Sequence, residues 1–174
     1  MVDARTTAKT TLPDLTRAIF RQRLIQRITA ANSARVILIT GQAAQGKTTL
    51  AAGLARQPGP ACAWMHLDAS ERDPMNLFRL LAHALAHALA TSLAEPDVSA
   101  FLKNPAISFG SKTGSGRIAE MAGALLEEIT ARAPVRIDLD GIEPLGGNAE
   151  RLAGVARIVD AVVRPGCVIL GCQE

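Results

Sequence analysis

The sequence predicts an α/β domain in which a parallel β-sheet lies between two layers of helices, a three-layer αβα arrangement. Two observations lead to this prediction. Short apolar segments of strand length alternate along the chain with longer segments of helical periodicity, and this alternation is typical of parallel sheets. The first such segment, residues 36–39, is apolar at every position, as a strand covered on both faces requires. With 174 residues, the chain has room for one domain.

The elements before and after the first strand are expected in a definite order. Residues 1–13 are polar and end at Pro13, which favours a flexible leader. An amphipathic helix with Asp14 as its cap is expected over residues 14–31. Residues 95–116 contain two prolines and three glycines, and we expect an irregular insertion there. The remaining elements are expected as strand 36–39, helix 47–56, strand 61–67, helix 75–93, helix 117–132, strand 134–139, helix 148–163 and strand 167–170.

The charge of the chain does not indicate a broad nucleic-acid-binding face. The net charge is +3, and the excess of basic residues lies in the first thirty residues. From residue 31 onward the chain has 13 basic and 14 acidic residues. No apolar run approaches the roughly 18–20 residues that cross a membrane, and the N-terminus does not resemble a signal peptide. The three cysteines lack metal-ligand spacing. We therefore expect a cytoplasmic protein with reduced thiols, no membrane contact and no direct DNA contact.

The strongest local motif directly follows the first expected strand. It fits the pattern Gly-x-x-x-x-Gly-Lys-Ser/Thr without substitution, and a helix is expected directly after it. Such a loop directs backbone N–H groups at phosphate oxygens, and the following helix adds the positive end of its dipole. We expect Lys47 to reach the β- and γ-phosphates, Thr48 to ligate Mg²⁺ and Thr49 to contact the α-phosphate region. The candidate nucleotide-binding residues are Gly41, Gln42, Ala43, Ala44, Gln45, Gly46, Lys47, Thr48 and Thr49.

A phosphate loop needs a carboxylate on a neighbouring strand to hold the metal. Asp138 and Asp140 lie two residues apart on the expected strand 134–139 and at its end, so they share a face. We favour Asp140 for Mg²⁺ because it lies where the strand ends, and we take Lys47 and Asp140 as the candidate catalytic residues. The alternative that both aspartates only form the turn at the end of the strand stays open, because Asp140 followed by Gly141 is also a turn signal.

Three segments together resemble the signal-transduction ATPases with numerous domains (the STAND class), in particular the ATPase module of maltose-activator-like, LuxR-type transcriptional regulators. That family carries an Arg-x-Arg-Leu-Leu stretch before its first strand, a Gly-Lys-Thr-Thr-Leu sequence after it, and a Trp-x-x-Leu-Asp second strand followed by an Asp-Pro turn. The matching segments here are residues 21–28, 46–50 and 64–74.

The resemblance implies a P-loop NTPase that binds ATP and Mg²⁺, hydrolyses ATP slowly and controls self-association through the bound nucleotide. It places Arg21 beside the adenine and Asp140 at the metal. It also implies that residues 14–174 are the N-terminal part of an ATPase domain, truncated after the fourth strand. Two positions differ from the family pattern: Gly141 stands where a second acid is common, and Gln173 stands where an arginine is usual. ATP binding therefore follows more directly than turnover.

Two other functions remain open at this stage. A P-loop kinase or phosphotransferase would use the same loop, but the segment 95–116, where its lid would lie, holds no arginine. A truncated, non-hydrolysing interaction module would agree with Gly141 and Gln173. Neither the signal sensed nor the oligomeric state follows from the sequence.

Overall fold

The computed structural model describes residues 4–30, 36–93, 115–142, 160 and 167–173. Within these residues the centre of the fold is a four-stranded sheet. Neighbouring strands are parallel throughout, and their spatial order is β1-β4-β3-β2. The predicted α/β class with a parallel sheet is confirmed. The strands are β1 (Val36–Gly41), β2 (Ala61–His66), β3 (Val135–Asp140) and β4 (Cys167–Gln173).

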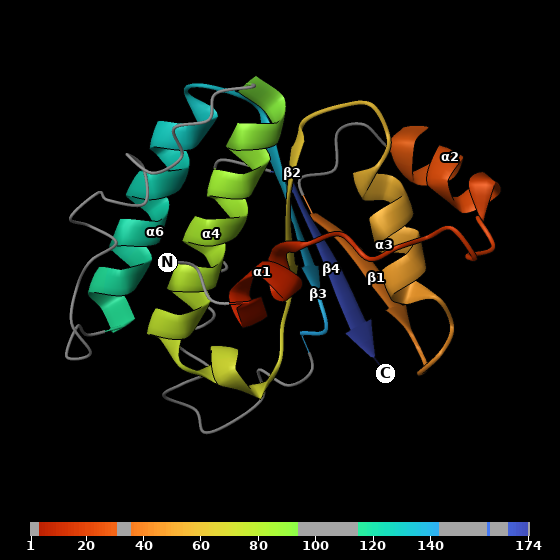
Figure 1. The fold of residues 1–174 in the computed structure, drawn as a ribbon, viewed down its shortest axis with the longest axis horizontal. Helices are drawn as coiled ribbons and strands as arrows, with labels where there is room; N and C mark the ends of the chain where they lie inside the picture. The colour runs from red at the N-terminus through yellow and green to blue at the C-terminus, as the bar shows by residue number, and fades with distance from the viewer. Residues whose placement is uncertain (1–3, 31–35, 94–114, 143–159, 161–166, 174) are drawn as a thin grey trace.

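Helices cover both faces of this sheet (Figure 1). Helices α4 and α6 lie on one side, and α2 and α3 lie on the other. The described helical elements are α1 (Ala4–Thr10), α2 (Gln22–Ala30), α3 (Lys47–Ala55), the 3₁₀ turn η1 (Ala69–Arg72), α4 (Pro74–Leu93) and α6 (Ser115–Thr130).

The parallel arrangement brings the carboxyl ends of all four strands to one edge of the sheet. Strand β1 pairs with β4 in a register that places Gly41 opposite Gln173, and β2 pairs with β3 so that His66 lies opposite Asp140. In open α/β sheets, ligands bind outside the carboxyl ends of the strands. This edge is therefore where a functional site is expected.

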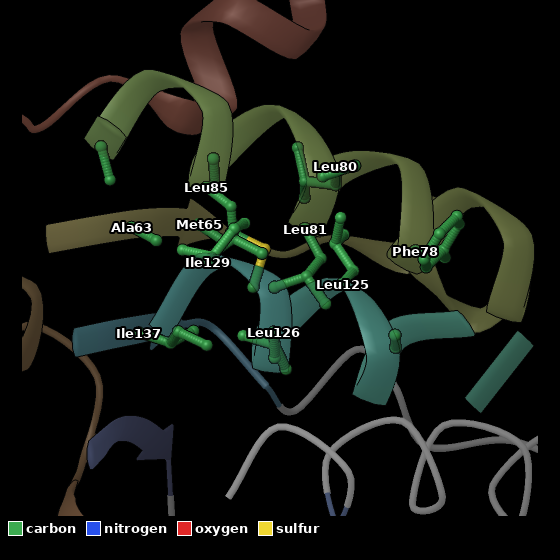
Figure 2. Packing of buried hydrophobic residues seen from close by; sticks show 14 of the residues in the cluster. Ala63, Met65, Phe78, Leu80, Leu81, Leu85, Leu125, Leu126, Ile129 and Ile137 are labelled. Atoms are coloured by element: carbon green, nitrogen blue, oxygen red, sulfur yellow. The ribbon is translucent and has the colours of Figure 1, made fainter. Parts of the chain in front are cut away.

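Strand β3 separates an apolar face from a polar one. Val135, Ile137 and Leu139 belong to the larger apolar core, which β2 and β3 form with α4 and α6 (Figure 2). Because side chains alternate along a strand, Arg136, Asp138 and Asp140 point to the opposite face. A second apolar core on that side joins side chains of α2 and α3 to Ile39 and Trp64. The polar residues of β3 thus face the layer that contains α3.

Helix α1 occupies most of the segment for which the sequence predicts a flexible leader, residues 1–13. Lys9 is only 8% exposed, and its ammonium lies 2.8 and 2.7 Å from the two carboxylate oxygens of Glu71. The ammonium also lies 2.9 Å from Asp68. Hydrogen bonds from Ser70, together with Lys9, hold the pKa of Asp68 well below its usual range. The prediction was wrong because the partners that hold α1 lie about sixty residues away in the chain. The sequence of residues 1–13 alone does not reveal them.

Helix α2 begins at Gln22, whereas the sequence predicts a helix from Asp14. The Asp14 carboxylate accepts hydrogen bonds from the Thr16 backbone N–H at 3.0 Å and from its hydroxyl at 2.9 Å. The Leu15 carbonyl then accepts from the Ala18 N–H at 3.0 Å. Short side-chain-to-backbone bonds of this kind compete with a helix and form turns instead.

Two further predictions fall largely outside the described residues. The irregular insertion predicted for 95–116 is described only at 115–116, which begin α6, and the helix predicted over 148–163 is described only at Asp160. In the part of the chain that the structure describes, no helix combines the length and apolarity needed to cross a membrane.

Candidate nucleotide-binding site

The loop that joins β1 to α3, residues 41–47, will be called the glycine loop. Gly46 has φ +79° and is the residue that caps the start of α3. This left-handed conformation strains residues that carry a Cβ, which explains the glycine. Ala44 also has a positive φ, +61°. No side chain caps the N-terminus of α3, so the first N–H groups of the helix remain suited to an anion.

Lys47, the first residue of α3, directs its ammonium back across the glycine loop. Its Nζ atom donates to the Gly41 carbonyl at 2.9 Å and to the Gln42 carbonyl at 2.8 Å. The Gln45 side-chain carbonyl closes the same turn by accepting from the Gln42 N–H at 3.1 Å. An ammonium has three N–H donors, so one remains for a further acceptor. The loop therefore encloses a positive charge that a phosphate oxygen can approach.

Thr48 and Asp140 meet between α3 and the end of β3. The Thr48 hydroxyl donates to the Asp140 carboxylate oxygens at 2.9 and 3.0 Å. Asp140 is 4% exposed, and a buried carboxylate requires such partners. The structure thus brings together the two residues that the sequence singled out as metal ligands.

Asp138, the alternative metal ligand in the sequence analysis, is engaged in a separate buried group. Arg136 donates to its carboxylate at 3.0 and 3.2 Å, and the Cys62 thiol lies 3.0 Å from it. Burial raises the pKa of Asp138, although Arg136 opposes the shift. Burial also raises the pKa of the Cys62 thiol, and the nearby Asp138 charge raises it further. With these contacts made, Asp138 has a structural role, and Asp140 is the carboxylate that faces the glycine loop.

His66, the last residue of β2, is a third member of the group around Asp140. Its Nδ1 atom lies 3.0 Å from the carboxylate, while its side chain is 55% exposed. His66 is not among the residues that the sequence predicts for the site. A signal was present, however, because the final residues of parallel strands meet at one edge of the sheet.

A cavity of about 280 Å³ lies beside the glycine loop. Arg21 is part of its lining, as the sequence analysis expected for the adenine side, and so is Thr49. Sequence reasoning missed Ile19 and Phe20, which also line the cavity and are 89% and 49% exposed. The sequence predicts Ile19 as an apolar position of the helix expected over residues 14–31, whereas the helix in the structure begins at Gln22. The remaining lining residues are Ile25, Ala44, Gln45, Gly46 and Leu50.

The two positions that differ from the family pattern lie at the same edge of the sheet. Gly141 follows Asp140 directly and has φ +73°. Gln173 ends β4 and lies opposite Gly41 in the strand register; only its backbone position is described. Glu143, a possible substitute acid, lies outside the described residues.

The donor groups at this edge of the sheet have the chemistry of a magnesium site. Mg²⁺ binds oxygen ligands, usually one or two carboxylates together with water and substrate phosphates. Within the described segments, no group of three or more His, Cys, Asp or Glu side chains is arranged to hold a metal by itself. A single carboxylate and a hydroxyl beside a phosphate-binding loop fit an ion that is shared with a nucleotide.

Comparisons of the sequence with protein-family models and with curated proteins find no match. The functional interpretation therefore depends on the geometry of the site and on the motifs themselves.

Proposed function

We propose that this chain is an ATP- and Mg²⁺-binding P-loop NTPase module. The observation that carries the proposal is the placement of Thr48 against Asp140, next to a loop whose own carbonyls hold the ammonium of Lys47. Lys47 and Thr48 at the start of α3 and Asp140 at the end of β3 would supply three functional groups of a phosphate site. A glycine turn without a ligand would explain the backbone of the loop, but it would not require a buried carboxylate beside the hydroxyl.

The phosphates would lie at the glycine loop and the start of α3. Backbone N–H groups in the first turn of α3 and the remaining N–H of Lys47 would bind their oxygens, since both features favour anions. Thr48 and Asp140 would hold Mg²⁺ together with phosphate oxygens and water. The metal would supply neutralisation of phosphate charge.

The base would lie in the cavity beside the loop. Arg21 and Thr49 line it together with the exposed ring of Phe20, and an aromatic ring or a guanidinium can stack on a base. The cavity volume of about 280 Å³ lies near the lower end of small-molecule sites, roughly 300 Å³. We infer that adenine enters here and that Arg21 contacts it.

The biological role that we propose is a nucleotide switch in a signalling or transcription regulator. This step rests on the resemblance to the STAND class in three segments. ATP and ADP would differ in their contacts with the glycine loop, and that difference would bias self-association of the cytoplasmic protein. We expect weak ATP hydrolysis, because Gly141 supplies no second acid after Asp140.

The decisive experiment compares ATP binding by the chain and by Lys47→Ala in isothermal titration calorimetry with Mg²⁺ present. Lys47→Ala should lower the affinity at least a hundredfold, because the substitution removes the enclosed charge. Arg79→Ala is the matched control: it removes a positive charge from an exposed position of α4, on the face of the sheet away from the cavity. Equal ATP affinity in the chain and in Lys47→Ala would overturn the proposal.

Phosphate release, measured beside binding, separates a hydrolysing switch from a module that only binds ATP. The absence of a second acid after Asp140 is the observation that most favours the module that only binds ATP. Tight binding with no release of phosphate above the uncatalysed rate would establish the non-hydrolysing module. Transfer of labelled phosphate to an added metabolite would instead establish a phosphotransferase.

A further inference from the structure

His66 and Asp140 form a fixed pair at the ends of two neighbouring strands. They are partners in the register of β2 and β3, and the Leu67 N–H donates to the Asp140 carbonyl at 2.8 Å just beyond them. The backbones of both residues are therefore held side by side. Within this frame the His66 Nδ1 atom lies 3.0 Å from Asp140 Oδ2.

The direction of the hydrogen bond follows from the chemistry of the two groups. An ionised carboxylate can only accept, so Nδ1 carries the proton in this contact. Asp140 then accepts from two sides, from the Thr48 hydroxyl and from the His66 ring. Two donors on different elements fix the rotation of the carboxylate, which a single hydroxyl would leave free to turn about its bond.

Gly141, the residue after Asp140, lies beside this ring. A Cβ built on Gly141 would lie 3.6 Å from His66 Cε1 and 3.1 Å from the Leu67 carbonyl oxygen. An acidic side chain at position 141 would therefore start in the space beside the imidazole. The second polar group at this edge of the sheet thus comes from β2.

We propose that His66 is a positioning residue of the Mg²⁺-nucleotide site, which holds the Asp140 carboxylate in the orientation that receives the metal. The inference rests on the proposed function. Side chains that hydrogen-bond a metal ligand fix its orientation, and their loss typically lowers metal affinity about 10–100-fold. His66 contacts the metal only through Asp140 and stays half exposed at the rim of the site.

The test measures how strongly Mg²⁺ increases ATP affinity, by calorimetry in Mg²⁺ and in EDTA. His66→Ala should reduce the increase caused by Mg²⁺ about tenfold and leave the affinity in EDTA unchanged. His66→Asn should restore most of the increase, because its amide N–H can occupy the place of Nδ1–H. His87→Ala is the control, since His87 is exposed on α4 and should behave as the unaltered chain.

The inference is overturned if Mg²⁺ increases the ATP affinity of His66→Ala as much as that of the unaltered chain, or if His66→Asn does not recover this increase. Either result would leave the proposed nucleotide site intact. If ATP affinity is the same in the unaltered chain and in Lys47→Ala, the proposed function fails as well. The two failures are therefore distinguishable. A second readout needs no nucleotide. The nitrogen NMR spectrum of the chain should show a protonated Nδ1 at His66, and this signature should disappear in Asp140→Ala; its persistence there would overturn the inference.

Discussion

The hydroxyl of Thr48 donates to both carboxylate oxygens of Asp140, at 2.9 and 3.0 Å, although the two residues lie 92 positions apart in the sequence. Helix α3 supplies the hydroxyl, and the end of β3 supplies the carboxylate. The contact connects the start of α3 to a central strand of the sheet and brings together two oxygen groups of the type that Mg²⁺ prefers.

Replacing Thr48 should separate metal binding from phosphate binding. Thr48→Val removes the hydroxyl at nearly constant shape, and we expect the increase of ATP affinity by Mg²⁺ to fall about tenfold. Thr48→Ser keeps the hydroxyl and should stay within about twofold of the unaltered chain. Titration calorimetry in Mg²⁺ and in EDTA measures both effects. If Mg²⁺ increases the ATP affinity of Thr48→Val as much as that of the unaltered chain, the hydroxyl does not bind the metal.

Phe20 should contribute to binding of the base and not to binding of the phosphates. Stacking of a base on an aromatic ring contributes about 1–3 kcal/mol, so Phe20→Ala should weaken ATP binding roughly 5- to 100-fold. Affinity for inorganic tripolyphosphate should not change. Leu38→Ala serves as a control, because Leu38 is exposed but does not line the cavity. A parallel loss of tripolyphosphate affinity would place Phe20 at the phosphates instead.

The ion pair between Lys9 and Glu71 should stabilise the fold measurably. Both side chains are more than 90% buried, and removal of one partner from a buried pair costs about 3–5 kcal/mol. We therefore expect Lys9→Met to lower the free energy of unfolding in urea by about that amount. Arg5→Met is the matched control, since Arg5 pairs with Asp68 at an exposed position and exposed pairs contribute about 0–1 kcal/mol. Similar losses in both variants would show that burial of the pair does not set its strength.

Alanine at Gly46 and at Gly141 should destabilise the protein to different degrees. Both glycines have a positive φ, +79° and +73°, and that conformation costs a residue with a Cβ about 1–2 kcal/mol. At Gly46 the nearest atom to an added Cβ is 4.0 Å away, whereas at Gly141 the Leu67 carbonyl oxygen lies at 3.1 Å. Crowding of this kind adds about 1–3 kcal/mol.

Urea unfolding of the two alanine variants measures this difference. We expect the larger loss of unfolding free energy in Gly141→Ala, because its neighbour is a backbone oxygen in a segment tied to β3 by the Leu67 hydrogen bond. Equal losses would mean that the turn after β3 relaxes without cost.

The sequence by itself determined the strands, most of the helices and the position of the glycine loop. All four strands occur where short strand-length segments between the expected helices predict them, and α3 begins at Lys47. These features depend on local causes: hydrophobic periodicity, glycines that tolerate a positive φ, and prolines that stop a helix. The same local information proposed Asp138 and Asp140 as a pair on one face of β3.

Only the tertiary structure decided which side chains contact each of those carboxylates. Arg136 and Cys62 engage Asp138, whereas Thr48 and His66 engage Asp140. It also fixed α1 through Glu71, whereas the expected first helix begins at Gln22 because Asp14 forms a local turn with Thr16. For Asp140 and for α1 the physical reason is the same: a buried charge needs a partner, and the partners Thr48, His66 and Glu71 lie more than sixty positions in the chain from the groups that they contact.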